Sequence, residues 1–136
     1  MPILLHILTM NKRIKSFGYA FRGIWKAFVT QPNMQIHFIF AILVAICGFL
    51  FDISKIEWLF CLFCFGLVLG AELINSAIEN VVDLASPEKH KLAANAKDMA
   101  AGAVLVCAIF SAIVGLIIFV PKVWLCLFGW QNSQHF

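Results

Sequence analysis

The chain has 136 residues, of which 62% are hydrophobic and only 12% are charged, and its formal net charge is +3. Together with a mean hydropathy of +0.94, these values exclude an ordinary soluble domain and make the lipid bilayer the expected solvent. We expect one integral membrane domain over residues 1–136, without a nucleic-acid partner.

The first ten residues are apolar, but they lack the features of a cleaved signal peptide. No basic residue precedes the apolar run, no small-residue cleavage site follows it, and the run is too short to span a bilayer. We therefore expect no cleavage here, and the sequence indicates no role for this segment.

Residues 11–29 have the pattern of an amphipathic helix, with apolar side chains at three- and four-residue spacing and basic residues between them. Such a helix is expected to lie on the membrane surface near anionic head groups, and a simple membrane anchor is the alternative interpretation. Gln31-Pro32-Asn33 should end it, because proline disfavours a helical conformation for the residue before it. The apolar positions are Ile14, Phe17, Phe21, Ile24, Trp25 and Phe28.

Three apolar stretches follow, and each is expected to form a transmembrane helix. A spanning helix needs about 20 mostly apolar residues. The stretch from Met99 to Val120 contains no charge, and the one that begins at Trp58 stays apolar through Ala71. The first stretch is the shortest and needs flanking residues to cross. The predicted spans are residues 35–51, 57–82 and 98–120.

The placement of the basic residues predicts the orientation. Most precede the first predicted span or lie between the second and the third, and only Lys55 and Lys122 lie on the other side. By the positive-inside rule, the N-terminus and the second loop face the cytoplasm. Trp58 and Trp124 stand where an outer aromatic belt would lie. The residues on the cytoplasmic side are Lys12, Arg13, Lys15, Arg22, Lys26, Lys89, Lys91 and Lys97.

The cysteines lie in or beside apolar segments. Cys61 and Cys64 have the spacing of a zinc-ligand pair, but no second pair of Cys or His follows at the spacing of a zinc finger. We interpret the cysteines as small apolar side chains that fill space.

The second predicted span ends in a polar stripe. At 100° per residue, the stripe residues project within about 60° of one another, with Asn75 on their flank. A charged carboxylate deep in hydrocarbon costs on the order of 2.5–3.5 kcal/mol, so these groups must meet a cation, a proton or a polar partner. The stripe consists of Glu72, Ser76, Glu79 and Asp83.

Three interpretations of the stripe remain open on the residues alone. Polar contacts between helices are common for a single Asn or Ser but weakly explain two glutamates and an aspartate. A proton or ion pathway would need polar groups through the whole membrane, whereas this stripe occupies one end. A metal-assisted active site at the interface would use one carboxylate as a ligand and another as a base, beside the basic loop 86–91. Conventional nucleotide-binding motifs are missing.

The sequence Glu-Leu-Ile-Asn-Ser-Ala-Ile-Glu-Asn-Val-Val-Asp at 72–83, followed by Lys97-Asp98-Met99, closely resembles the signature of the prokaryotic diacylglycerol kinase family. The resemblance extends from about Lys12 to Val120. It implies an all-α homotrimeric bundle with a surface helix and three transmembrane helices in each chain, located in the bacterial inner membrane. It also implies shared active sites on the cytoplasmic side, with ATP and Mg²⁺ used to phosphorylate a lipid alcohol.

The resemblance also implies roles for individual residues. Glu72 matches the family's general base, Glu79 matches a magnesium ligand within the nucleotide site, and Asn75 matches the residue that helps to hold the phosphates and orient the base. Lys97, at the head of the third span, would face the ATP phosphates. The further positions that match nucleotide contacts are Lys12 or Arg13, Tyr19, Glu88, His90 and Asp98.

One position departs from the family pattern. Gln31 aligns with a second glutamate that binds metal in the family, and a glutamine oxygen is a neutral and weaker magnesium ligand. We therefore expect the second metal to bind less tightly here, or a shifted residue to replace the missing ligand.

The substrate expected from the resemblance is undecaprenol. The segment Asn33-Met34-Gln35-Ile36-His37 resembles the undecaprenol kinase branch more than the diacylglycerol kinase branch, although the position of His37 at a span boundary already explains it. Diacylglycerol kinase activity is the alternative. From a different functional class, a small ion- or proton-conducting bundle would use the same carboxylates.

Overall fold

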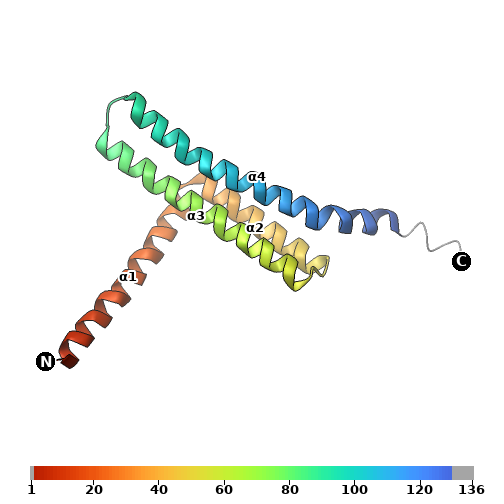
Figure 1. Cartoon of the computed structure of the whole chain (residues 1–136), viewed down its shortest axis with the longest axis horizontal. Helices are drawn as coiled ribbons and strands as arrows, with labels where there is room; N and C mark the ends of the chain where they lie inside the picture. Colours follow the sequence, from red (N-terminus) through yellow and green to blue (C-terminus); the bar gives the residue numbers. More distant parts are fainter. Residues whose placement is uncertain (1, 130–136) are drawn as a thin grey trace, which may run out of the picture.

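The computed structural model describes residues 2–129, with side chains from residue 14 onward. This part of the chain is all-helical, as predicted (Figure 1). Three of its helices are long and apolar enough to cross a membrane. The first helix of the chain extends well beyond the predicted segment 11–29, and the last extends well beyond the predicted segment 98–120. The helices are α1 (Pro2–Thr30), α2 (Pro32–Leu50), α3 (Lys55–Ala85) and α4 (Lys91–Phe128).

The break between α1 and α2 occurs at Gln31, where the sequence predicted it. Gln31 is extended, with φ −107° and ψ 110°, because Pro32 follows it. The side-chain amide of Gln35 donates a hydrogen bond to the Phe28 carbonyl over 3.0 Å, which ties the two helices together across the break. From this joint α1 diverges from the bundle (Figure 1). Its apolar side chains, such as Phe21 and Trp25, are largely exposed.

The turn between α2 and α3 contains a capping box. The Glu57 amide donates to the Ser54 hydroxyl over 3.3 Å, and the Ser54 amide donates to the Glu57 carboxylate over 2.7 Å. The other Glu57 oxygen pairs with Lys122 of α4 at 3.2 Å. The start of α3 is thereby fixed to the α2–α3 turn and to α4.

Replacing Ser54 with Ala should destabilise this turn. The variant loses the side-chain acceptor of the capping box, and such losses typically cost about 1 kcal/mol. We expect a decrease of this size in the free energy of unfolding, measured by reversible unfolding of the protein in mixed detergent micelles. An unchanged free energy would show that the Glu57–Lys122 pair alone holds this end of α3.

The small core lies near the same turn. Ile53, Cys61 and Ile118 are buried against one another, which agrees with cysteine as an apolar space-filler. Trp58 lies so close to Gly48 that a Cβ atom there would be 2.7 Å from the indole ring. A glycine is therefore needed for α2 and α3 to approach this closely.

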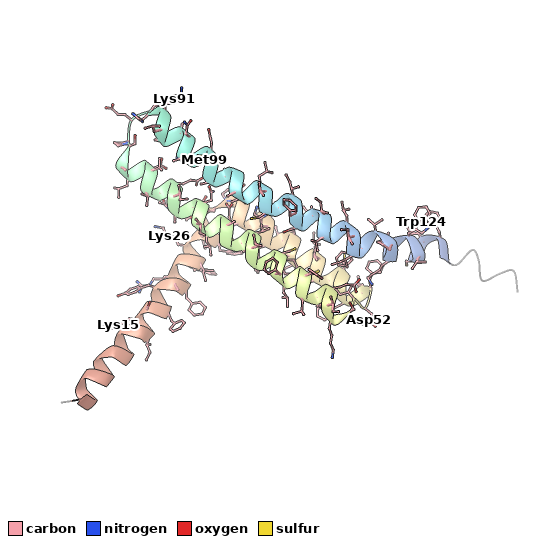
Figure 2. The ribbon with its side chains drawn as sticks, viewed as in Figure 1. Lys15, Lys26, Asp52, Lys91, Met99 and Trp124 are labelled. Carbon is pink, nitrogen blue, oxygen red and sulfur yellow. The ribbon has the colours of Figure 1, made fainter. Side chains whose placement is uncertain are left out.

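Figure 2 shows the two ends of the bundle. Lys91 lies at one end, where loop 86–90 joins α3 to α4, and Asp52 lies at the opposite end. α4 packs most extensively against α3, and the α3–α4 hairpin continues past the start of α2 (Figure 1). We refer to the Lys91 end as the loop end and to the Asp52 end as the distal end.

Candidate active site

The polar stripe of α3 runs from the interior of the bundle to the loop end. Glu72 is 1% exposed and is the most deeply buried large side chain described, and Asn75 and Ser76 are also buried. Glu79, two turns along the helix from Glu72, is half-buried, and Asp83 is exposed. The stripe therefore passes from a dry environment to a wet one over three helical turns.

Hydrogen bonds divide the stripe into structural and available groups. The Ser76 hydroxyl donates to the Glu72 carbonyl over 2.9 Å, and the Asn80 amide donates to the Ser76 carbonyl over 2.8 Å. Both bonds stay within the helix, so these two side chains are already used. The Asn75 amide donates to the Glu79 carboxylate over 3.3 Å and orients it. Asn75 and Glu79 thus form a connected pair at the middle of the stripe.

Two buried oxygens of the stripe have no hydrogen-bond partner among the described residues. They are Oε2 of Glu72 and Oδ1 of Asn75. A buried polar atom without a partner costs about 1–3 kcal/mol, and native structures rarely keep such atoms without a reason. Both atoms are acceptors, so they require a hydrogen-bond donor or a cation. This is the arrangement expected of a site that becomes complete when a ligand binds.

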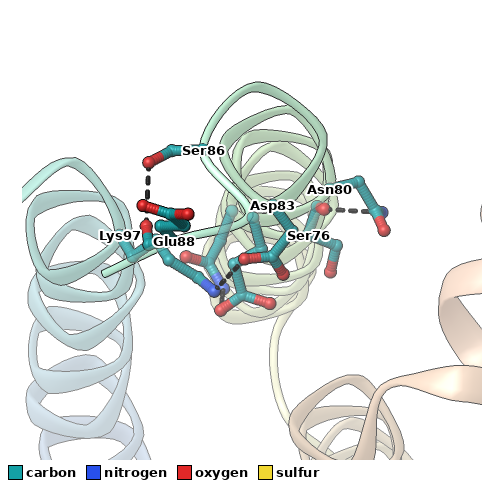
Figure 3. Close-up of polar contacts among 8 residues, drawn as sticks. Ser76, Asn80, Asp83, Ser86, Glu88 and Lys97 are labelled. Carbon is teal, nitrogen blue, oxygen red and sulfur yellow. Dashed lines mark hydrogen bonds and ion pairs between the residues drawn. The ribbon is translucent and has the colours of Figure 1, made fainter. Parts of the chain in front are cut away.

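Lys97 connects α4 to the stripe. Its ammonium group lies 2.7 Å from the Asp83 carboxylate, and Figure 3 shows the two side chains pointing toward each other from α4 and α3. The sequence placed Lys97 near the carboxylates and Asp83 on the stripe, but it did not identify them as partners. Asp98, the next residue, is exposed.

The α3–α4 loop positions two further predicted residues. The Ser86 hydroxyl donates to the Glu88 carbonyl over 3.0 Å, which leaves the exposed Glu88 carboxylate unused (Figure 3). His90 is the N-cap of α4, where Nδ1 accepts a hydrogen bond from the Leu92 amide over 3.2 Å. His90 therefore has a structural role in starting α4, which the sequence did not predict.

Among the described residues, neither Tyr19 nor Gln31 has a hydrogen bond or ion pair with the stripe. Tyr19 of α1 is 63% exposed, and its ring carries the Arg22 guanidinium group 5.0 Å from the ring centre. Gln31 is half-buried at the joint between α1 and α2. The side chains of Lys12 and Arg13 lie outside the described part.

An apolar groove lies on the distal side of the stripe. Its volume is about 690 Å³, and it lies between α2, α3 and α4. Val68 and Leu69, one turn before Glu72, line it together with His37, and Val123 lines it farther along. The sequence did not predict this groove, because apolar residues that face a groove and apolar residues that face lipid have the same pattern in sequence.

The side-chain oxygens of the stripe and of Asn75 suit magnesium as ligands. Carboxylate and amide oxygens are hard ligands, and Mg²⁺ in proteins commonly takes one or two carboxylates and completes its coordination with water and substrate phosphates. Within the described residues no three His, Cys, Asp or Glu side chains gather as a metal-binding group. The half-buried Glu79, with the free Asn75 oxygen beside it, fits such a sparse ligand set.

The fold and the site define a class of small helical membrane proteins with a buried carboxylate and amide cluster at one membrane edge. Residues 18–119 match the family model described as prokaryotic diacylglycerol kinase. The chain belongs to the prokaryotic diacylglycerol kinase family.

Individual relatives carry two names. The chain is 48% identical over 117 residues to an undecaprenol kinase of Bacillus subtilis (strain 168), covering 86% of this chain and 95% of the relative. It is 41% identical over 107 residues to a diacylglycerol kinase of Synechocystis sp., covering 78% of this chain and 61% of that relative. It is 32% identical over 100 residues to a diacylglycerol kinase of Escherichia coli (strain K12), covering 74% of this chain and 82% of that relative.

Proposed function

We propose that this protein transfers the γ-phosphate of ATP to the hydroxyl group of undecaprenol. Family membership supports a lipid kinase, and the relative that is 48% identical is named an undecaprenol kinase, whereas those at 41% and 32% are named diacylglycerol kinases. The observation that carries the proposal is the buried Glu72 carboxylate. Its Oε2 has no hydrogen-bond partner among the described residues, and Glu72 lies one helical turn from Val68, which lines an apolar groove.

Glu72 would act as the general base. Its free Oε2 is available to accept the proton of a lipid alcohol, and the groove lined by Val68 and Leu69, one helical turn away, suits the hydrocarbon chain of that lipid. As the proton leaves, the alcohol oxygen forms a bond to the γ-phosphorus while the bond between that phosphorus and the ADP oxygen breaks. Solvent at the wet end of the stripe then takes the proton from Glu72.

Glu79, Asn75 and Lys97 would hold the polyphosphate. Phosphoryl transfer requires mainly positioning and charge neutralisation, and Lys97 supplies a cation at the wet end of the stripe. Glu79 would hold Mg²⁺, with Gln31 as a weaker ligand for a second ion. When bound, Mg²⁺ neutralises charge on the phosphate oxygens. Asp83 keeps Lys97 in place before the nucleotide binds.

The remaining nucleotide contacts would come from a homotrimer with shared sites. Within the described part of one chain, neither Tyr19 nor Gln31 has a hydrogen bond or ion pair with the stripe, and the 63% exposed Tyr19 is accessible to a neighbouring copy. The exposed apolar faces of α2, α3 and α4 offer surfaces for such packing. The residues proposed to contact the nucleotide in this way are Lys12 or Arg13, Tyr19, Glu88, His90 and Asp98.

The loop end would face the cytoplasm of the bacterial inner membrane, where ATP is available. The basic residues of α1 and loop 86–90 support this orientation. We propose that α1 lies in the interface, with its exposed aromatic side chains in the membrane and its basic side chains at the head groups.

Comparing two lipids side by side tests the substrate. Purified protein in mixed micelles should phosphorylate undecaprenol with a higher kcat/KM than diacylglycerol. A higher value for diacylglycerol would replace the proposed substrate with the alternative one.

An ion-conducting bundle has less support, because the stripe gives way at Glu72 to an apolar groove and no polar path continues to the distal end within the described residues.

Replacing Lys97 with Met should weaken ATP binding. The variant keeps the length of the side chain but removes the positive charge facing the phosphates, so KM for ATP should rise by roughly tenfold, which corresponds to about 1.4 kcal/mol. Steady-state kinetics at varied ATP measures this. The control is Asp83→Asn, which breaks the same ion pair but keeps the lysine charge, so its KM for ATP should rise much less than that of Lys97→Met. Equal effects in both variants would mean that the pair acts only through structure.

Replacing Gln31 with Glu should lower the Mg²⁺ concentration needed for activity. The substitution restores a charged ligand at the joint between α1 and α2, and a carboxylate binds Mg²⁺ more strongly than an amide does. Titration of activity with Mg²⁺ at fixed ATP measures the half-saturating concentration. An unchanged requirement would show that Gln31 does not face the metal site.

A further inference from the structure

The distal end of α4 projects beyond the rest of the bundle. The Lys122–Glu57 ion pair joins α4 to the first turn of α3, and Asp52 lies in the turn at the same end. After Lys122 the helix continues to Phe128 with no other helix beside it (Figure 1). We call Val123–Phe128 the α4 extension. It lies outside residues 18–119, which match the family model.

The α4 extension is apolar and exposed on all sides. Trp124, Leu125 and Leu127 are each more than 60% exposed, Cys126 is exposed, and the ring centres of Trp124 and Phe128 lie 4.5 Å apart with their planes tilted by 38°. At 100° per residue, Leu125 and Cys126 project about 100° and 200° from Trp124. A partner protein would cover one face of a helix, whereas a membrane surrounds a helix on every side.

The length of α4 places the extension at a definite depth. The segment from Met99 to Pro121 carries no charge, and at 1.5 Å per residue it is about 34 Å long, which matches the roughly 30 Å hydrocarbon core. The six residues after Lys122 add about 9 Å. The head-group layer is about 5–8 Å thick on each side, so the extension is slightly longer than this layer is deep and begins at its inner boundary. Tryptophan is enriched at this level of the membrane.

We propose that the α4 extension binds the head-group layer of the distal leaflet and acts as an interfacial anchor. The Lys122–Glu57 pair marks the boundary between the bundle and this anchor. The rings of Trp124 and Phe128 lie among the lipid carbonyl and head groups, and Leu125 and Leu127 lie between them at the same level of the membrane. The partner is the lipid surface itself, and the proposal holds whatever reaction the loop end catalyses.

Depth-dependent quenching of tryptophan fluorescence tests this. The full-length protein carrying Trp25→Phe and Trp130→Phe retains Trp58 and Trp124, and adding Trp124→Phe gives the matched reference. Both are reconstituted in phosphatidylcholine vesicles brominated either near the head group or deep in the acyl chain. The difference between them reports Trp124 alone. We expect shallow bromines to quench it at least twofold more than deep ones.

A second variant examines the opposite side of the helix. Cys126→Trp in the reference background places the only extension tryptophan about 200° from Trp124. The anchor predicts the same shallow quenching for this probe. Quenching at only one of the two positions would mean that another copy of the chain covers the other side, and no quenching at either would mean that the extension lies in water. Either result would overturn the proposal, and neither readout depends on kinase activity.

Discussion

Glu72→Gln should abolish phosphoryl transfer while leaving the helical bundle intact. Glutamine keeps the size of the side chain but cannot accept the alcohol proton, and loss of a general base typically lowers the rate by roughly 10²–10⁴-fold. The buried position makes folding tolerant of the change, because a neutral amide is easier to bury than a carboxylate. We expect kcat to fall by this amount with little change in KM for ATP, measured with labelled ATP in mixed micelles.

Glu57→Gln is the matched control for this prediction. It makes the same chemical change on the same helix but at the distal end, where Glu57 pairs with Lys122 and caps α3. Its activity should stay within about twofold of the wild type. If both variants lost activity equally, the effect of Glu72→Gln would be attributed to structure. If Glu72→Gln kept its activity, the proton would have to leave by another route.

Glu79→Gln should have the second-largest effect, through the metal. The Glu79 carboxylate is oriented by Asn75 at 3.3 Å, and a neutral amide in its place binds Mg²⁺ weakly. We expect the half-saturating Mg²⁺ concentration to rise by at least roughly 10–100-fold, as found even for changes in groups that only support a metal ligand. Excess Mg²⁺ should restore part of the activity. Mg²⁺ titrations of activity at saturating ATP measure both effects.

Asn80→Ala distinguishes a metal effect from a general disturbance of α3. Asn80 is the next residue along the helix, but its side chain bonds only to the Ser76 carbonyl of the same helix. Its Mg²⁺ requirement should match that of the wild type. A Glu79→Gln variant that loses activity at every Mg²⁺ concentration without a shift of the midpoint would contradict the assignment of Glu79 as a ligand.

Helical periodicity made the stripe predictable from the sequence. Residues 72, 76, 79 and 83 share a face whatever surrounds the helix, and the hydropathy of the neighbouring stretches defined the spans. The break at Gln31 followed from the proline after it. These features depend on local geometry, which the sequence determines directly.

The contacts between elements could not be predicted in this way. The pairing of Lys97 with Asp83 depends on how loop 86–90 positions α4, and the capping role of His90 depends on where that helix begins. α4 also continues through Pro121, where the apolar run seemed to end, and Lys122 finds its partner in Glu57. The unpartnered oxygens of Glu72 and Asn75 became visible only with the packing around them.

Counting products from wild-type protein tests the central claim most directly. Purified protein in micelles with undecaprenol and γ-labelled ATP should yield labelled undecaprenyl phosphate, with one ADP formed for each labelled lipid. The same reaction with Glu72→Gln should leave the label in ATP. Two results would contradict a lipid kinase built on this stripe. One is that neither undecaprenol nor diacylglycerol carries label above the Glu72→Gln background, and the other is that ADP is released without labelled lipid.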